Sequence, residues 1–223
     1  QASLPLSMHL AYQLLTVGRQ QEADALFEST RALSVQRGDA RVLAYGTVDF
    51  NHCPAGQAAR CDQRLSEARG VLSGFLPPNQ PVFGVLEASI AELALARGEL
   101  QPARAALLRA LAIFDSAPTL RSGRVLAAAT LARVELTLGN LDAAASRAVE
   151  AVTQARTFSN GFAHSRWLGH ALVAQGMVQR ARGESAAARA TWRAALAELQ
   201  PTLGESAPAT EEARRLLADP QSQ

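Results

Sequence analysis

Apolar residues recur at spacings of three and four along most of this chain, which is the pattern of amphipathic helices. A first such stretch runs from about Leu6 to Val17 and a second from about Gln21 to Val35, separated by the breaker Gly18-Arg19. The alternation of apolar and polar residues that marks half-buried strands is absent from the sequence. The pattern therefore predicts an all-α protein built from helical hairpins.

The same spacing, with its Gly and Pro breakers, predicts five consecutive hairpins and a last helix. The last helix, at about 209–218, is polar on one side, which suits a cap on the end of a stack of repeats. We expect the fifth hairpin to close at Pro201 and the whole chain, 1–223, to form one continuous domain. The five hairpins are expected at about 4–38, 40–76, 81–116, 122–158 and 163–200.

Small residues punctuate the predicted hairpins at a regular interval. A Gly that ends one helical stretch is followed five residues later by an Ala, early in the next stretch. The pairs recur about every 41 residues, except that the interval between the first and second pairs is about twice as long. This period is typical of stacked helical hairpins. The pairs are Gly18/Ala23, Gly98/Ala103, Gly139/Ala144 and Gly183/Ala188.

The pattern within each hairpin resembles the tetratricopeptide repeat (TPR). That family has small residues where its two helices touch, a large apolar residue four positions after the Ala of the second helix, and another Ala three positions later. The fifth hairpin has nearly the whole pattern, in Gly176, Ala188, Trp192 and Ala195. Two helices approach closely only where neither carries bulk at the crossing, which explains the small residues. The long period resembles that of kinesin light chains, and the resemblance implies a right-handed α-solenoid of about five repeats.

A narrower resemblance concerns Cys53-Pro54-Ala55-Gly56 with Arg60-Cys61, and the closing segment from Ala194 to Thr210. Both look like parts of the repeat arrays found C-terminal in bacterial membrane-anchored serine/threonine kinases. The resemblance implies a non-catalytic sensor or scaffold module of a larger signalling protein. The chain begins at Gln1 without Met, so we expect it to be a piece of something longer.

The TPR resemblance also implies a binding surface. In such arrays the first helix of each hairpin lines a concave groove that holds a protein or peptide partner. The alternative is an ordinary solvated inner face. The positions of this sequence that correspond to the groove are His9, Tyr12, Glu92, Arg133, Met177 and Arg180, with Tyr45 and Asp49 in the second repeat.

The chain has two cysteines, Cys53 and Cys61, eight residues apart on either side of the irregular loop in the second hairpin. This placement favours a disulfide that closes the loop, and hence an oxidising, periplasmic or otherwise extracytoplasmic location. The alternative is a pair of buried or idle thiols in a cytoplasmic protein, because free cysteine is commonly buried.

Composition and motifs argue against several other functions. Twenty-two basic residues are interleaved with 20 acidic ones for a net charge of +2, which does not favour nucleic-acid binding. No apolar run reaches the length of about 18 residues that a membrane span needs. The four histidines have no metal-ligand spacing, and no phosphate-binding or dinucleotide motif is present, so we expect no metal, no cofactor and no enzymatic activity.

The leading functional hypothesis is therefore a protein- or peptide-binding sensor or scaffold. We expect it to be the extracytoplasmic part of a bacterial serine/threonine kinase. Self-association of the chain is a further hypothesis. The second hypothesis is a cytosolic TPR regulatory domain of a transcription activator or adaptor, which would bind a small molecule or a partner protein. An enzyme would need an acid, base or nucleophile converging on a pocket, and the sequence does not suggest one.

Overall fold

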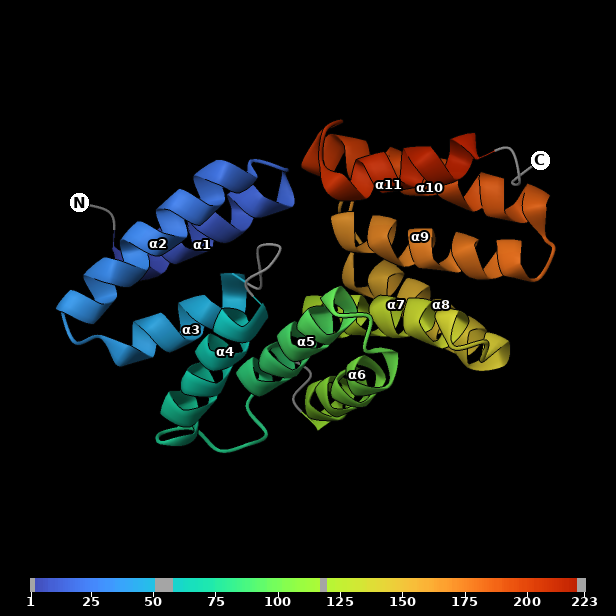
Figure 1. Cartoon of the computed structure of the whole chain (residues 1–223). Coiled ribbons are helices and arrows are strands. Elements are labelled where there is room, and N and C mark those ends of the chain that lie inside the picture. The colour runs from blue at the N-terminus through green and yellow to red at the C-terminus, as the bar shows by residue number, and fades with distance from the viewer. Residues whose placement is uncertain (1–2, 51–57, 117–119, 220–223) are drawn as a thin grey trace. The chain divides into compact units, whose positions relative to one another are not determined.

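A computed structural model of the chain describes residues 3–50, 58–116 and 120–219, excluding the side chains of residues 49 and 50 (Figure 1). Over these ranges the secondary structure is helical, without strands, so the predicted all-α class is confirmed. The described helices are α1 (Leu4–Thr16), α2 (Gln20–Gln36), α3 (Ala40–Phe50), α4 (Ala58–Ser73), α5 (Pro81–Ala96), α6 (Leu100–Ser116), α7 (Arg121–Thr137), α8 (Leu141–Phe158), α9 (Arg166–Ala181), α10 (Ser185–Leu203) and α11 (Pro208–Ala218).

Consecutive helices pack as the predicted hairpins: α1 with α2, α3 with α4, α5 with α6, α7 with α8, and α9 with α10. The last helix, α11, packs on α10, as expected for a cap (Figure 1). The chain divides into two compact units, residues 1–117 with α1–α6 and residues 118–223 with α7–α11. Each unit is described separately below, and one continuous domain stays a prediction.

The hairpin turns confirm the glycine positions that the sequence singled out. Gly18, Gly98, Gly139 and Gly183 have φ between 74° and 84°, a conformation that side chains with a Cβ rarely adopt. In each turn the amide after the glycine donates to a carbonyl of the preceding helix, as in the bond from Asn140 N to Glu135 O (2.8 Å). This bond is the mark of a Schellman helix end, and it fixes where the second helix of the hairpin begins.

The core of the first unit changes in character along the chain. Between α1 and α2 it is small, with Met8, Ala11, Ala23 and Phe27 buried together. Across α3, α4 and α5 a larger cluster includes Val48, Leu65, Leu72, Phe83 and Leu86. Contacts of α3 with α1, α2 and α5 connect the hairpins of this unit.

The core of the second unit is rich in alanine. Fully buried alanines line the helix crossings, so α7, α8 and α9 approach one another closely. Trp192 of α10 is the largest fully buried side chain there, at 0% exposure. Its indole packs against Gly176 of α9, as the TPR pattern predicts.

One predicted boundary is wrong. Helix α10 does not end at Pro201 but continues to Leu203, and Gly204, with φ of 90°, follows it. Pro201 has no backbone N–H, so the last turn of α10 lacks one backbone hydrogen bond. The same turn has a side-chain hydrogen bond, which Thr202 Oγ1 donates to Glu198 O (2.7 Å). The extra turn buries Leu203.

Candidate functional site

Helix α9 carries a stripe of polar and flexible side chains at helical spacing. Arg166, His170, Met177 and Arg180 lie four, seven and three residues apart, which places them along one face of the helix. The residues between them include Ala171, which is buried, so the opposite face of α9 belongs to the core. Met177 and Arg180, predicted from the sequence as groove residues, therefore lie on the side of α9 that faces away from Ala171, and both are half-buried there.

Arg133 of α7 faces the last helix of the chain. Its guanidinium donates to Glu212 of α11 through Nη2 to Oε1 (2.6 Å) and Nη1 to Oε2 (3.2 Å). This is the parallel two-bond arrangement that guanidinium and carboxylate groups form best. The Arg133 side chain remains 44% exposed, so water also reaches this pair.

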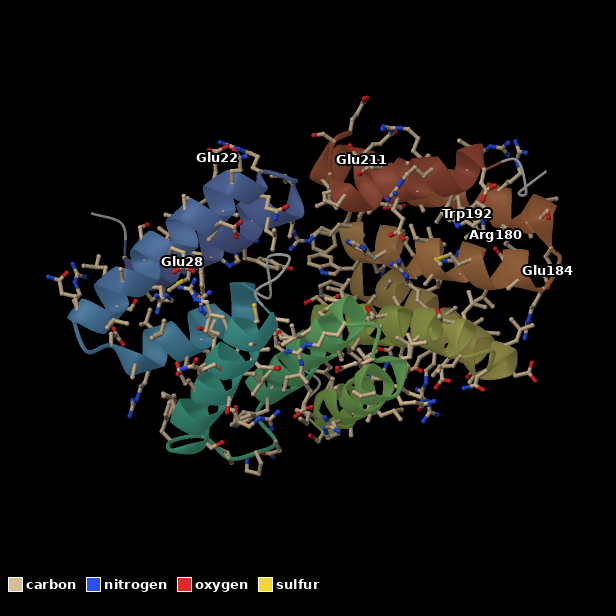
Figure 2. All side chains as sticks on the ribbon, in the orientation of Figure 1. Glu22, Glu28, Arg180, Glu184, Trp192 and Glu211 are labelled. Atoms are coloured by element: carbon tan, nitrogen blue, oxygen red, sulfur yellow. The ribbon has the colours of Figure 1, made fainter. Side chains whose placement is uncertain are left out.

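Arg180 of α9 contacts the same end of the chain. Its Nη1 donates to Asp219, the residue that follows α11 (3.0 Å). The Arg180 guanidinium also lies 5.4 Å from the ring centre of Trp192, within the range of a cation–π contact. Figure 2 shows Arg180 beside Trp192, and the contact orients the guanidinium without filling all of its donors.

His170 of α9 has a shifted pKa, to which Arg133 and Arg166 contribute. Burial of the ring, followed by the positive charges of Arg133 and Arg166, lowers its pKa from 6.5 to about 4. The imidazole is therefore neutral at pH 7. The contributions of Arg133 and Arg166 indicate that positive charge from α7 and from α9 acts at His170.

Helix α11 packs on α10, and carboxylates in it and just after it meet Arg133 and Arg180. The buried residues of α11 are Thr210 and Ala213, and both have small side chains. Its other face is polar, and it includes the exposed Glu211. Charge pairs with partly exposed partners contribute little to stability, so the ion pairs to Arg133 and Arg180 do not fix α11 firmly.

The predicted groove residues of the first unit belong to α1, α3 and α5. His9 is exposed on α1, with Nε2 3.1 Å from Gln13 Nε2 and its ring centre 6.3 Å from that of Tyr12. Tyr45 is 38% exposed on α3 and lies 6.4 Å, ring to ring, from Phe75. Glu92 is exposed on α5.

Two predicted residues fall outside the described part of the structure. The side chain of Asp49, near the end of α3, is not described, and neither is Cys53. Cys61 is buried, 7% exposed, in the core cluster of α3, α4 and α5. The Cys53–Cys61 disulfide therefore stays a prediction.

Sequence reasoning missed the residues that meet the arginines. Glu212 lies on the polar side of the last helix, but nothing in its spacing points to Arg133, 79 residues earlier. Asp219 and His170 gave no signal of their own. Only the stacking of α7, α9, α10 and α11 brings these groups together.

The described residues contain neither a metal-binding cluster nor a membrane-spanning helix. Within residues 3–50, 58–116 and 120–219, no group of three or more His, Cys, Asp or Glu side chains is arranged to hold a metal ion. Among the described helices, none has both the length and the apolar character needed to cross a membrane.

Comparison with solved structures decides the fold family. Two crystal structures of a candidate kinesin light chain from Podosopora anserina, with nearly identical TPR-like repeats, match with TM-scores of 0.58 and 0.57. They share 20% and 19% of their residues with this chain, and each match covers 91% of this chain and 99% of the other. The chain has a TPR-like fold.

BtubC (BKLC) from P. vanneervenii matches as well, with a TM-score of 0.57 and 15% identity over 100% of this chain and 87% of that one. No protein-family model matches this sequence, and no curated protein matches it. At these identities the likeness shows the fold alone. The predicted all-α array of TPR-like hairpins is confirmed.

Proposed function

We propose that the chain is a non-catalytic protein-interaction module that binds an acidic segment of a partner on the α7/α9 face of the second unit. This face is defined by Arg133, His170, Met177 and Arg180. The observation that carries the proposal is that Arg133 and Arg180 each already hold a carboxylate, from Glu212 and Asp219 of the same chain. A surface that binds carboxylates from its own last helix has the geometry to bind them from a partner.

The character of the partner follows from the charges on this face. Three guanidinium groups, those of Arg133, Arg166 and Arg180, lie on α7 and α9, and they favour Asp or Glu side chains in the partner. Met177 offers a flexible apolar surface next to them, suited to an aliphatic or aromatic side chain. Arginine and methionine are also enriched at protein interfaces generally.

The carboxylates of α11 compete with such a partner. A partner must displace Glu212 and Asp219 from the arginines. Its apparent affinity is therefore its intrinsic affinity multiplied by the fraction of chains in which these pairs are open. Exposed ion pairs are worth about 0.2–1 kcal/mol each, so this competition lowers affinity without preventing binding.

The test is a titration with a synthetic peptide of the sequence Ala-Pro-Ala-Thr-Glu-Glu-Ala-Arg-Arg-Leu-Leu-Ala-Asp, which copies residues 207–219, against a second peptide with Gln and Asn in place of its acidic residues. The acidic peptide should bind, and Arg133→Gln or Arg180→Gln should weaken it by up to about fivefold, the size of one exposed ion pair. Arg193→Gln, an exposed arginine of α10, is the matched control. Equal binding of the two peptides would remove the basis of the proposal.

We further propose the setting that the sequence suggested, the extracytoplasmic sensor region of a bacterial serine/threonine kinase. Its support is the cysteine pair around residues 53–61 and the resemblance of the loop and closing segments. The second candidate is a cytosolic regulatory domain of a transcription activator or adaptor. A Cys53/Cys61 reduction potential below about −300 mV favours the first setting, whereas thiols that stay reduced in a glutathione buffer favour the second.

A further inference from the structure

The first unit contains a cleft between the first two hairpins. It has a volume of about 270 Å³ and opens between α2, α3 and α4. This volume is just below the usual lower end for small-molecule sites, about 300 Å³, so the cleft suits a small ligand. It lies within residues 1–117, whereas the proposed peptide surface lies within residues 118–223, so the two sites are independent.

The floor of the cleft is apolar. Leu43 and Ala44 of α3 and Ala68 and Val71 of α4 line it. Ala44 and Ala68 are only 2% and 3% exposed, so these small side chains leave space that the neighbouring helices do not fill. An aliphatic or small aromatic group in this space would bury apolar surface, which is the main source of affinity in small pockets.

The rim of the cleft is cationic. Arg31 of α2 and Arg64 of α4 both line it, and both donate to Glu28 of α2, through Nε (3.0 Å) and Nη2 (2.6 Å). Arg60 adds a third guanidinium, 3.8 Å from the same carboxylate. Figure 2 labels Glu28 on the side of α2 that faces these helices.

The seam between α2 and α4 is therefore charged where stacked hairpins usually pack apolar side chains. Arg31, Arg60 and Arg64 are opposed by Glu28 and by Glu67, a lining residue to which Gln63 donates (2.8 Å). The charged residues that line the cleft itself are Arg31, Arg64 and Glu67, which give the rim a net charge of +1. A ligand with one negative charge would neutralise it.

The arginine geometry leaves room for a second acceptor. Arg64 is held in place by its bond to Glu28 and by Phe27, whose ring centre is 5.7 Å from the guanidinium, and its side chain is only 14% exposed. A guanidinium has five N–H donors, and in the described bonds Arg31 and Arg64 each use one. Each guanidinium therefore keeps N–H donors that these bonds to Glu28 do not use.

We propose that this cleft binds a small amphipathic monocarboxylate, with the carboxylate at Arg31 and Arg64 and the apolar tail against Leu43, Ala44, Ala68 and Val71. A long acyl chain exceeds the volume, and a dicarboxylate would over-compensate a rim of charge +1. The proposal does not depend on the peptide-binding surface of the second unit.

The test is calorimetric titration of the full chain with octanoate, with acetate as the head group alone and 1-octanol as the tail alone. Octanoate should bind saturably and at least tenfold more tightly than acetate or 1-octanol. Arg31→Gln and Arg64→Gln should each weaken octanoate about tenfold, the effect of one charged hydrogen bond. The matched control is Arg37→Gln, an exposed arginine just after α2, which should leave the affinity unchanged.

A cleft-filling variant separates this site from binding elsewhere on the surface. Ala68→Leu places a larger side chain in the cleft while all three arginines remain, and it should abolish octanoate binding. Ala44→Leu repeats the test from α3 if Ala68→Leu does not fold. Octanoate that binds no better than 1-octanol, or that binds both filled variants as tightly as the parent chain, would overturn the proposal.

Discussion

The indole of Trp192 occupies the space where a side chain at Gly176 would begin. A Cβ built at Gly176 would lie 2.6 Å from Trp192 Cδ1 and 2.8 Å from Cε2, closer than any ordinary contact. The indole Nε1 also donates to Val173 O (3.3 Å), which fixes the ring against α9. The close approach of α9 and α10 therefore depends on a glycine at this position.

We expect Gly176→Ala to lower the free energy of unfolding by about 1–3 kcal/mol, because the added methyl overpacks the contact with Trp192. Alanine is otherwise the better helix former by about 1 kcal/mol, so the expected loss runs against intrinsic propensity. Gly70→Ala in α4 is the matched control, since a Cβ there meets nothing within 4 Å, and it should stabilise the chain. Urea denaturation of both variants measures the two effects, and equal changes would contradict this account.

His170 should make stability depend on pH. Its folded pKa of about 4 lies below the ordinary value of 6.5, so the unfolded chain binds a proton at this site more readily. The stability that its neutral form provides is fully present above about pH 6.5 and is lost as the pH falls toward 4, by up to about 3 kcal/mol.

Thermal unfolding between pH 4 and 7 tests this expectation. His170→Gln should flatten the profile in that range, whereas His164→Gln, an exposed histidine of the same unit, should not. An unchanged slope in His170→Gln would show that the ring titrates normally.

Glu87 of α5 connects three helices of the first unit. Its buried carboxylate, 4% exposed, accepts from Arg69 Nη2 of α4 (2.6 Å) and Arg109 Nε of α6 (2.8 Å). Glu87→Gln should lower the free energy of unfolding by about 1–3 kcal/mol, because it replaces one acceptor oxygen with an amide that faces a donor. The exposed Glu99→Gln should change it by less than about 0.5 kcal/mol.

The sequence predicts the local features of this fold well. The four hairpin turns that the structure describes each have a glycine with positive φ, and the Gly/Ala spacing singles out all four. The Gly176–Trp192 contact also follows from the repeat pattern, because both residues occupy its defining positions. The end of α10 was predicted wrongly because a proline in the last turn removes only one hydrogen bond, which tertiary packing of Leu203 can offset.

The candidate sites depend on contacts that periodicity does not contain. Arg133 and Glu212 are 79 residues apart, and their pairing follows from the number of hairpins stacked between them. The cleft beside Arg64 likewise arises where charged side chains replace apolar ones at the seam between α2 and α4. A helical pattern shows which face is polar but not which distant residue faces it.

The most direct test of the central claim is the affinity of the acidic peptide for a chain that lacks the competing carboxylates. Glu212→Gln combined with Asp219→Asn frees Arg133 and Arg180 without touching the binding face. The account predicts that this double variant binds the acidic peptide several-fold more tightly than the parent chain, and that adding Arg133→Gln removes the gain. An affinity unchanged or weakened in the double variant would contradict it.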